Sequence, residues 1–186
     1  MTAPLWESLF KPASADPEVD QLLRGNILFA DLNARQIRFV RNIVHLRRYR
    51  ETEVIFRQGE TGVGMYIILE GSVAITVNGP GSEPAAASGP IEIATLRPGD
   101  FFGELALVED NCRRSADARA LEDSQLIGFF KPDLLEILER NPAAGVRITM
   151  RLGQVLGRRL RKTTDRLSEL EEQHRKKTQQ TTESSI

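Results

Sequence analysis

Short apolar runs separated by turn residues fill the middle of this chain, and they constrain its fold more than any other feature. Between Arg47 and Phe130 these runs are rich in β-branched and aromatic residues: EVIF, MYIIL, SVAITV, IEIATL and SQLIGFF. The turns between them carry glycine or proline, as in RQGETGVG, EGS and RPGD. Runs of this length bounded by Gly and Pro are typical of β-strands. Several of them at this spacing indicate a β-sandwich or barrel.

Helical patterns flank the strand-rich region on both sides. From Pro17 to Leu46 the pattern is helical, with Asn33 as a suitable N-cap and Gln36 three residues later, as in a capping box. On the other side PDLLEILER begins at Pro132 and is closed by Asn141-Pro142. We therefore expect a mainly β fold of the α+β type, with helices covering one end of the strands.

A longer helix is predicted from Val146 to Leu170. Read in heptads, its two seam positions hold Val146, Gly153, Leu160 and Leu167, and Thr149, Leu156, Thr163 and Leu170. Charged residues surround this stripe, which favours a homodimer through a short coiled coil over residues 146–170. The alternative is a single helix packed back on the barrel, because the stripe is short and contains glycine and threonine. The polar stretch after Leu170 is expected to fray.

Composition indicates a soluble protein with balanced charge. The 186 residues include 25 basic and 26 acidic side chains, which gives no strong field toward nucleic acid or a membrane. No apolar run is long enough to span a membrane and the start lacks a signal segment, so we expect a cytoplasmic protein. A single cysteine, Cys112, excludes an internal disulfide.

Two further segments predict local structure but no function. PLWESLF near the N-terminus places its apolar residues on one side of a helix, which predicts a small helix packed on the protein's own core. NGPGSEPAAASGP, from Asn78 to Pro90, is too poor in apolar residues to pack and predicts a mobile hairpin loop.

Side chains suited to catalysis or metal binding are few. His45 and His174 are far apart in the sequence, so a zinc site lacks ligands. No base accompanies Cys112 or any serine in a recognisable arrangement, so we expect a protein that is not an enzyme. The basic run from Arg158 to Lys162 is more typical of a solvated helix face than of a DNA-binding surface.

One stretch, FFGELALVEDNCRRSADARA from Phe101 to Ala120, carries a pattern that calls for a ligand. Glu104 stands in an apolar run, and burying an unpaired carboxylate costs several kcal/mol. The preceding glycine lets backbone N–H groups approach an anion closely, and an arginine ten residues later is a forked donor suited to phosphate. A carboxylate acceptor fits a ribose hydroxyl. The sequence therefore predicts a pocket for a sugar phosphate.

The same stretch resembles a known motif. FGELALVEDNCRRSADARA is similar to the phosphate-binding cassette of the cyclic nucleotide-binding domain, in the bacterial catabolite activator protein / cAMP receptor protein superfamily, and FRQGETGVGMYIILEGSVAI resembles that family's strand and glycine pattern. The resemblance covers roughly Asn26 to Leu167. It implies an antiparallel β-roll of the jelly-roll type, divided into an N-terminal extension (1–25), the binding domain (26–143), a dimer helix (144–172) and a polar tail (173–186).

Roles for the cassette residues follow from the resemblance. The turn from Gly103 to Ala106 would offer backbone N–H groups, chiefly those of Gly103 and Leu105, and Glu104 would bind the ribose 2′-hydroxyl. Arg114 and Ser115 would hold the cyclic phosphate. Arg113 is the competing arginine, but the run RSADARA matches the end of the cassette and leaves Arg113 in the preceding loop.

The long helix adds a second resemblance. RRLRKTTDRL, from Arg158 to Leu167, is similar to the dimer helix of the same superfamily, in which hydroxyls from the two subunits contact the adenine. The matching residues are Thr163 and Thr164, with Arg159 one turn earlier. A polar residue at a seam position also has a structural interpretation, because it can fix the register of a coiled coil.

The sequence therefore predicts a cytoplasmic regulatory protein that binds a cyclic nucleotide. Ser115 and the threonine pair favour cAMP over cGMP as the ligand, and no metal is expected. With no catalytic or DNA-binding segment expected after Leu170, the signal would pass to a partner protein through the C-terminal helix. The alternatives are a β-roll scaffold that has lost ligand binding and a truncated DNA-binding transcription regulator.

Overall fold

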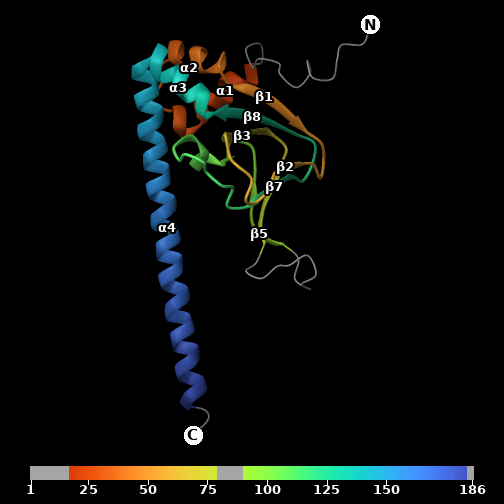
Figure 1. Ribbon diagram of the computed structural model, residues 1–186, viewed down its shortest axis with the longest axis vertical. Coiled ribbons are helices and arrows are strands. Elements are labelled where there is room, and N and C mark those ends of the chain that lie inside the picture. Colours follow the sequence, from red (N-terminus) through yellow and green to blue (C-terminus); the bar gives the residue numbers. More distant parts are fainter. Residues whose placement is uncertain (1–16, 79–89, 184–186) are drawn as a thin grey trace. The chain divides into compact units, whose positions relative to one another are not determined.

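The computed structural model describes residues 17–78 and 90–183 (Figure 1). The chain divides into two compact units, Met1–Ile148 and Thr149–Ile186. The predictions for PLWESLF and for nearly all of the loop from Asn78 to Pro90 fall outside the described residues. Among the described helices, none has both the length and the apolar character that crossing a bilayer would need.

Two antiparallel sheets make up the first unit. One sheet has the order β1-β8-β3-β6, with β1 at His45–Tyr49, β8 at Ser124–Phe130, β3 at Gly64–Glu70 and β6 at Phe101–Phe102. The other has the order β2-β7-β4-β5, with β2 at Val54–Phe56, β7 at Asp117–Ala120, β4 at Val73–Val77 and β5 at Ile91–Leu96. Buried residues of both sheets share one core cluster: Ile68, Val73, Phe102, Ala118 and Leu126. The predicted antiparallel β-roll is confirmed.

Strand pairing places one strand where the sequence predicted a helix. The helical pattern was expected to reach Leu46, but α2 (Ala34–Arg41) ends earlier and β1 begins at His45. His45 pairs with Gly128 and Tyr49 pairs with Ser124 of β8. The prediction was wrong because pairing with a distant central strand overrides a local helical pattern.

Helices cover one end of the sheets in the first unit. They are α1 (Pro17–Gly25), the 3-10 turn η3 (Ile27–Phe29), α2 and α3 (Lys131–Arg140), and Figure 1 shows α1, α2 and α3 gathered there. The predicted capping box is confirmed, since Asn33 Oδ1 accepts from the Gln36 amide at 3.0 Å and Gln36 Oε1 accepts from the Asn33 amide at 3.1 Å. The Phe29 ring meets the Phe129 ring of β8 edge to face, which joins these helices to the sheet.

A single helix, α4 (Pro142–Glu183), runs from the end of the first unit through the second. The structure continues it past Leu170, where the sequence analysis expected fraying. The residues beyond that point are mostly Glu, Gln, Lys, Arg and Thr without glycine or proline, so no residue type stops the helix. Large seam residues of α4 are exposed in the single chain, Leu160 at 68% and Leu167 at 57%.

Candidate functional site

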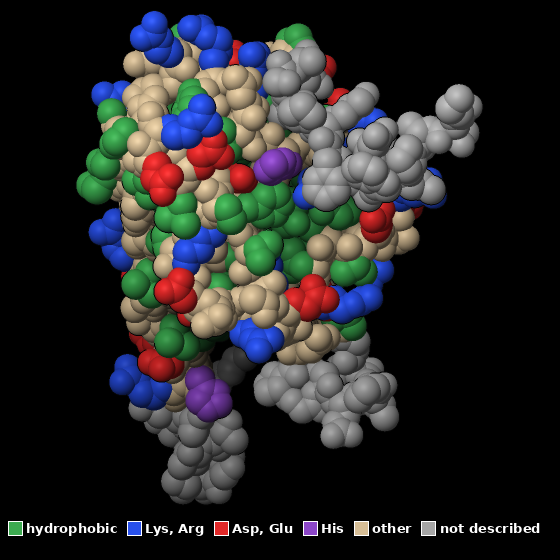
Figure 2. Space-filling view, turned by 45° about the horizontal axis from the view of Figure 1, so that its top comes forward, with side chains coloured by type: hydrophobic (Ala, Val, Ile, Leu, Met, Phe, Trp, Pro, Cys, Tyr) green, Lys and Arg blue, Asp and Glu red, His purple; other side chains and the backbone are tan. Residues whose placement is uncertain are grey.

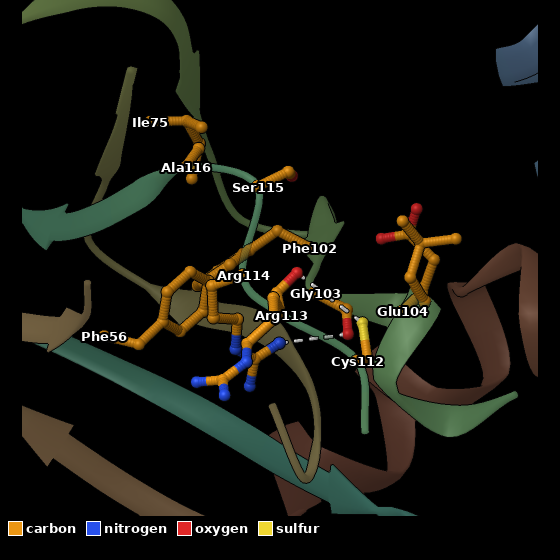
Figure 3. Close-up of a pocket in the computed structure, with 11 residues that line it drawn as sticks. Phe56, Ile75, Phe102, Gly103, Glu104, Cys112, Arg113, Arg114, Ser115 and Ala116 are labelled. Carbon is orange, nitrogen blue, oxygen red and sulfur yellow. Dashed lines mark hydrogen bonds between the residues drawn. The ribbon is translucent and has the colours of Figure 1, made fainter. Parts of the chain in front are cut away.

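A cavity of about 130 Å³ lies inside the first unit, beside the predicted cassette (Figure 3). Its wall comes from β2, β4, β6, the 3-10 turn η4 (Glu104–Leu107) and the segment that leads into β7. The lining residues are Phe56, Ile75, Phe102, Gly103, Glu104, Leu105, Cys112, Arg113, Arg114, Ser115 and Ala116. The structure thus brings together most of the residues that the sequence placed in a sugar phosphate pocket.

Gly103 has a left-handed backbone that turns the chain from β6 into η4. Its φ is +77°, a conformation that costs a residue with a side chain about 1–2 kcal/mol. A Cβ atom at this position would lie 2.4 Å from Arg114 Nη1 and 3.3 Å from the Gly64 carbonyl oxygen. Glycine is therefore required both for the turn and for the space that the Arg114 guanidinium occupies.

The residues of η4 differ in what they present to the cavity. Glu104 is buried and Leu105 is 42% exposed, and both line the cavity. Ala106 is buried, does not line the cavity, and its amide donates to the Gly103 carbonyl at 3.2 Å. The structure therefore brings Glu104 and Leu105 to the site, but it directs the Ala106 amide into the turn itself.

Arg114 is a buried cation on the cavity wall, only 7% exposed. Its Nη1–H donates to the Gly103 carbonyl at 3.1 Å, and its Cζ lies 4.0 Å from the centre of the Phe56 ring (Figure 3). Burial lowers the pKa of Arg114, but an arginine remains protonated in proteins. The cavity thus carries a fixed positive charge beside apolar rings.

The loop after β2 holds the arginine segment in place through its backbone. The Arg114 amide donates to the Glu60 carbonyl at 2.9 Å, and the Gly59 amide donates to the Arg114 carbonyl at 2.8 Å. A Cβ atom on Gly62 would stand 3.1 Å from Arg114 Cζ. The sequence predicted a turn at RQGETGVG and a resemblance to the family's strand and glycine pattern, but no site role for Phe56 or Gly62. The glycines that follow EVIF could have indicated a site role for this loop. The residue that they adjoin, Arg114, lies far along the chain, so the sequence did not show the contact.

The neighbours of Arg114 have different environments. Arg113 is exposed and its Nη1–H donates to the Gly59 carbonyl at 3.0 Å, while Ser115 is exposed at the cavity.

Burial, followed by the hydrogen bond and charge of Glu109, raises the pKa of the Cys112 thiol. A thiol with a raised pKa is a poor nucleophile at neutral pH.

Three predicted ligand residues lie on α4 in the second unit. Arg159, Thr163 and Thr164 are exposed there. The Thr163 hydroxyl donates to the Arg159 carbonyl at 2.9 Å, and the Thr164 hydroxyl donates to the Leu160 carbonyl at 3.0 Å. Their contact with a ligand stays a prediction.

Charges of both signs are mixed over the face of the protein shown in Figure 2. Within residues 17–78 and 90–183, no group of three His, Cys, Asp or Glu side chains is arranged to hold a metal ion. Arg114 and Glu104 are the buried charged side chains that line the cavity.

The region that forms this cavity matches a known protein family. A family model described as "Cyclic nucleotide-binding domain" matches residues 46–141, more than half of the 186 residues. The chain belongs to the cyclic nucleotide-binding domain family. The match includes the cavity residues from Phe56 to Ala116.

Relatives of this cyclic nucleotide-binding domain include two bacterial proteins whose names refer to cyclic AMP. The chain is 30% identical over 139 residues to the "Cyclic AMP receptor protein" of Thermus thermophilus, covering 75% of this chain and 59% of that protein. It is 29% identical over 126 residues to the "cAMP-activated global transcriptional regulator CRP" of Salmonella typhimurium, covering 68% of this chain and 55% of that protein. The chain therefore spans between half and two thirds of the length of these relatives.

Solved structures share the fold. The catabolite activator protein of Thermus thermophilus superposes with a TM-score of 0.68 at 30% identity, covering 78% of this chain and 63% of that one. A cyclic nucleotide-binding domain from Methylobacillus flagellatus superposes with a TM-score of 0.70 at 23% identity, with 85% of each chain covered, and shows likeness of fold alone.

Proposed function

We propose that this cyclic nucleotide-binding domain is a regulatory protein whose ligand is cAMP. The observation that carries the proposal is the buried guanidinium of Arg114, which faces the cavity from a position fixed by Gly103 and Phe56. One fixed cation matches the single negative charge of a cyclic phosphate. Apolar rings on the same wall would exclude water and strengthen that attraction.

Five of the residues that line the cavity have a role in ligand binding in this proposal. Arg114 and Ser115 hold the cyclic phosphate, and the Gly103 and Leu105 amides face its oxygens. Glu104, buried at the start of η4, accepts a hydrogen bond from the ribose 2′-hydroxyl. The chemistry is binding, so we propose no enzymatic step and no metal.

The choice of cAMP over cGMP rests on Ser115 and on the α4 residues. Thr163 and Thr164, with Arg159 one turn earlier, would contact the adenine in a homodimer formed through residues 146–170. The exposed seam residues Val146, Leu160 and Leu167 support the dimer, because exposed apolar residues in a row favour a partner surface. The names of the Thermus and Salmonella relatives also refer to cAMP.

Signalling would follow from a shift of α4 upon binding. A ligand that binds one conformation more tightly than another moves the population toward it. The output would reach a partner protein in the cytoplasm. A second candidate is a DNA-binding regulator, favoured by the name of the Salmonella relative, a transcriptional regulator.

Calorimetric titration with cAMP and with cGMP tests the binding proposal. Wild-type protein should bind cAMP saturably and more tightly than cGMP. Arg114→Ala should weaken cAMP binding by about one to two decades, because a charge-assisted hydrogen bond contributes roughly 1.5–3 kcal/mol. Arg113→Ala is the matched control and should bind nearly as wild type. No binding of either nucleotide, to protein freed of co-purified ligand, would leave a scaffold as the better description.

Hydrogen exchange tests the switching proposal separately. Protection of α4 from Gly145 onward should change when cAMP is added. Unchanged protection throughout the helix would contradict switching and leave binding intact.

Sedimentation of wild type and of Leu160→Asp would test the dimer, since a charge at this exposed seam position should shift the protein toward monomer.

A further inference from the structure

We propose that Phe56 is a positioning residue for phosphate binding, holding the Arg114 guanidinium by a cation–π contact. This inference rests on the proposed function, because Arg114 must be the phosphate-binding group. Phe56 acts through Arg114.

The contact geometry supports a stacked guanidinium. Arg114 Cζ lies 4.0 Å from the centre of the Phe56 ring, well inside the distance of about 6 Å at which a cation is attracted by an aromatic face. Two other cation–π contacts among the described residues are longer, 5.8 Å for Arg47 over Phe130 and 5.3 Å for Arg140 over Phe39. Arg114 is also far more buried than a surface arginine, so water screens its contact with the ring less.

The surrounding residues leave the guanidinium little room to move. Its Nη1–H is directed to the Gly103 carbonyl, and a Cβ on Gly103 would overlap that nitrogen. A Cβ on Gly62 would stand 3.1 Å from both Nε and Cζ. The two glycines therefore admit the guanidinium, and the Phe56 ring supports one of its faces.

The Phe56 ring is itself held by the fold. Phe56 pairs with Ala118 at the end of β2, and its ring contacts the rings of Phe102 and Tyr66 at centroid distances of 5.7 and 6.3 Å. Figure 3 shows the Phe56 ring beside the Arg114 side chain at the cavity wall. A ring fixed by these neighbours can fix a cation in turn.

The consequence is a preorganised phosphate donor. An arginine has many rotamers, and ordering such a side chain when a ligand binds costs affinity, about 0.5–1.5 kcal/mol, or roughly 2- to 10-fold. An arginine already held by the ring avoids this cost. Phe56 should therefore improve cAMP affinity without contacting the phosphate.

Fluorinated phenylalanines at position 56 test this electrostatic role while nearly preserving ring shape. Wild-type protein and variants with one, two or three ring fluorines are titrated with cAMP, since each fluorine weakens the attraction of the ring face for a cation. The dissociation constant should rise stepwise, by about 2- to 5-fold at three fluorines. The same series at Phe129, which is fully buried and meets the Phe29 ring, is the control and should leave cAMP affinity unchanged.

A conventional pair of variants supports the series. Phe56→Leu should weaken cAMP binding by about 2- to 10-fold, and Phe56→Tyr, which keeps the aromatic face, should stay close to wild type. Equal affinities across the fluorine series would overturn the positioning role while leaving cAMP binding by Arg114 intact. Absence of cAMP binding by the wild type would overturn the proposed function and this inference with it.

Discussion

The cavity of the first unit and the helix of the second carry predicted ligand residues in very different states. At the cavity, Arg114 is buried, hydrogen bonded to Gly103 and stacked on Phe56. On α4, Thr163 and Thr164 are exposed, and their hydroxyls donate to carbonyls of their own helix. The same superfamily resemblance pointed to both sets.

This difference between Arg114 and the α4 threonines shows which part of the molecule fixes the binding geometry. Contacts that hold Arg114 come from β2, from the loop after it and from the turn before η4, so several elements of one chain form the cavity wall. The hydrogen bonds of the Thr163 and Thr164 hydroxyls stay within α4 and are not made to another element. Substitutions around Arg114 should therefore affect binding and folding together, whereas substitutions of the threonines should affect binding alone.

The largest effect is expected at Gly103, where backbone and guanidinium compete for space. Gly103→Ala should lower the free energy of unfolding by about 1–2 kcal/mol, because φ is +77°. It should also weaken cAMP binding by about tenfold or more, since the new Cβ would displace Arg114 Nη1. Denaturant unfolding and calorimetry measure the two effects.

Gly99→Ala is the matched control for that substitution. Gly99 also has a left-handed backbone, with φ of +92°, but a Cβ there meets nothing within 4 Å. Gly99→Ala should lower the free energy of unfolding by a similar amount and leave the affinity for cAMP unchanged. Equal losses of affinity in both variants would mean that the space around Arg114 does not matter for binding.

A smaller effect is expected when both α4 hydroxyls are removed. Replacing Thr163 and Thr164 together by Val should change the free energy of unfolding by less than about 0.5 kcal/mol, because both side chains are exposed. Loss of the adenine contacts should lower cAMP affinity by about fivefold for each ordinary hydrogen bond removed. Affinity equal to wild type would confine the binding site to the cavity and remove the threonines from it.

The smallest effect is expected at an exposed ion pair between Asp110 of the cassette and Lys131 at the start of α3. The hydrogen bond and charge of Lys131 lower the pKa of Asp110 below its ordinary value of 3.8. A lowered carboxyl pKa stabilises the fold above the ordinary value, and this stabilisation is lost as the pH falls through the lowered pKa. Because the pair is exposed, its contribution should be slight.

Thermal unfolding of wild type and Asp110→Asn between pH 7 and about pH 3 measures this contribution. The small difference in melting temperature at neutral pH should shrink as the pH falls below 3.8. A difference that is constant over the whole pH range would exclude Asp110 ionisation as its cause.

Local patterns determined much of the fold. Asn33 and Gln36 are three residues apart, so their capping box follows from sequence spacing alone. The five apolar runs became β2, β3, β4, β5 and β8 because each has β-forming residues and a glycine or proline near at least one end. Glu104, Arg114 and Ser115 were selected by the cassette pattern, and all three line the cavity.

Tertiary contacts decided the rest. The segment at His45 became a strand because β8 pairs with it, and DARA became β7 because it lies between β2 and β4 although its small alanines give a weak strand signal. The Phe56 ring of β2 meets the Arg114 guanidinium of the segment before β7, which is distant in sequence. Periodicity records which residues a chain can bury, whereas the partner of each buried residue is chosen only when the two sheets pack together.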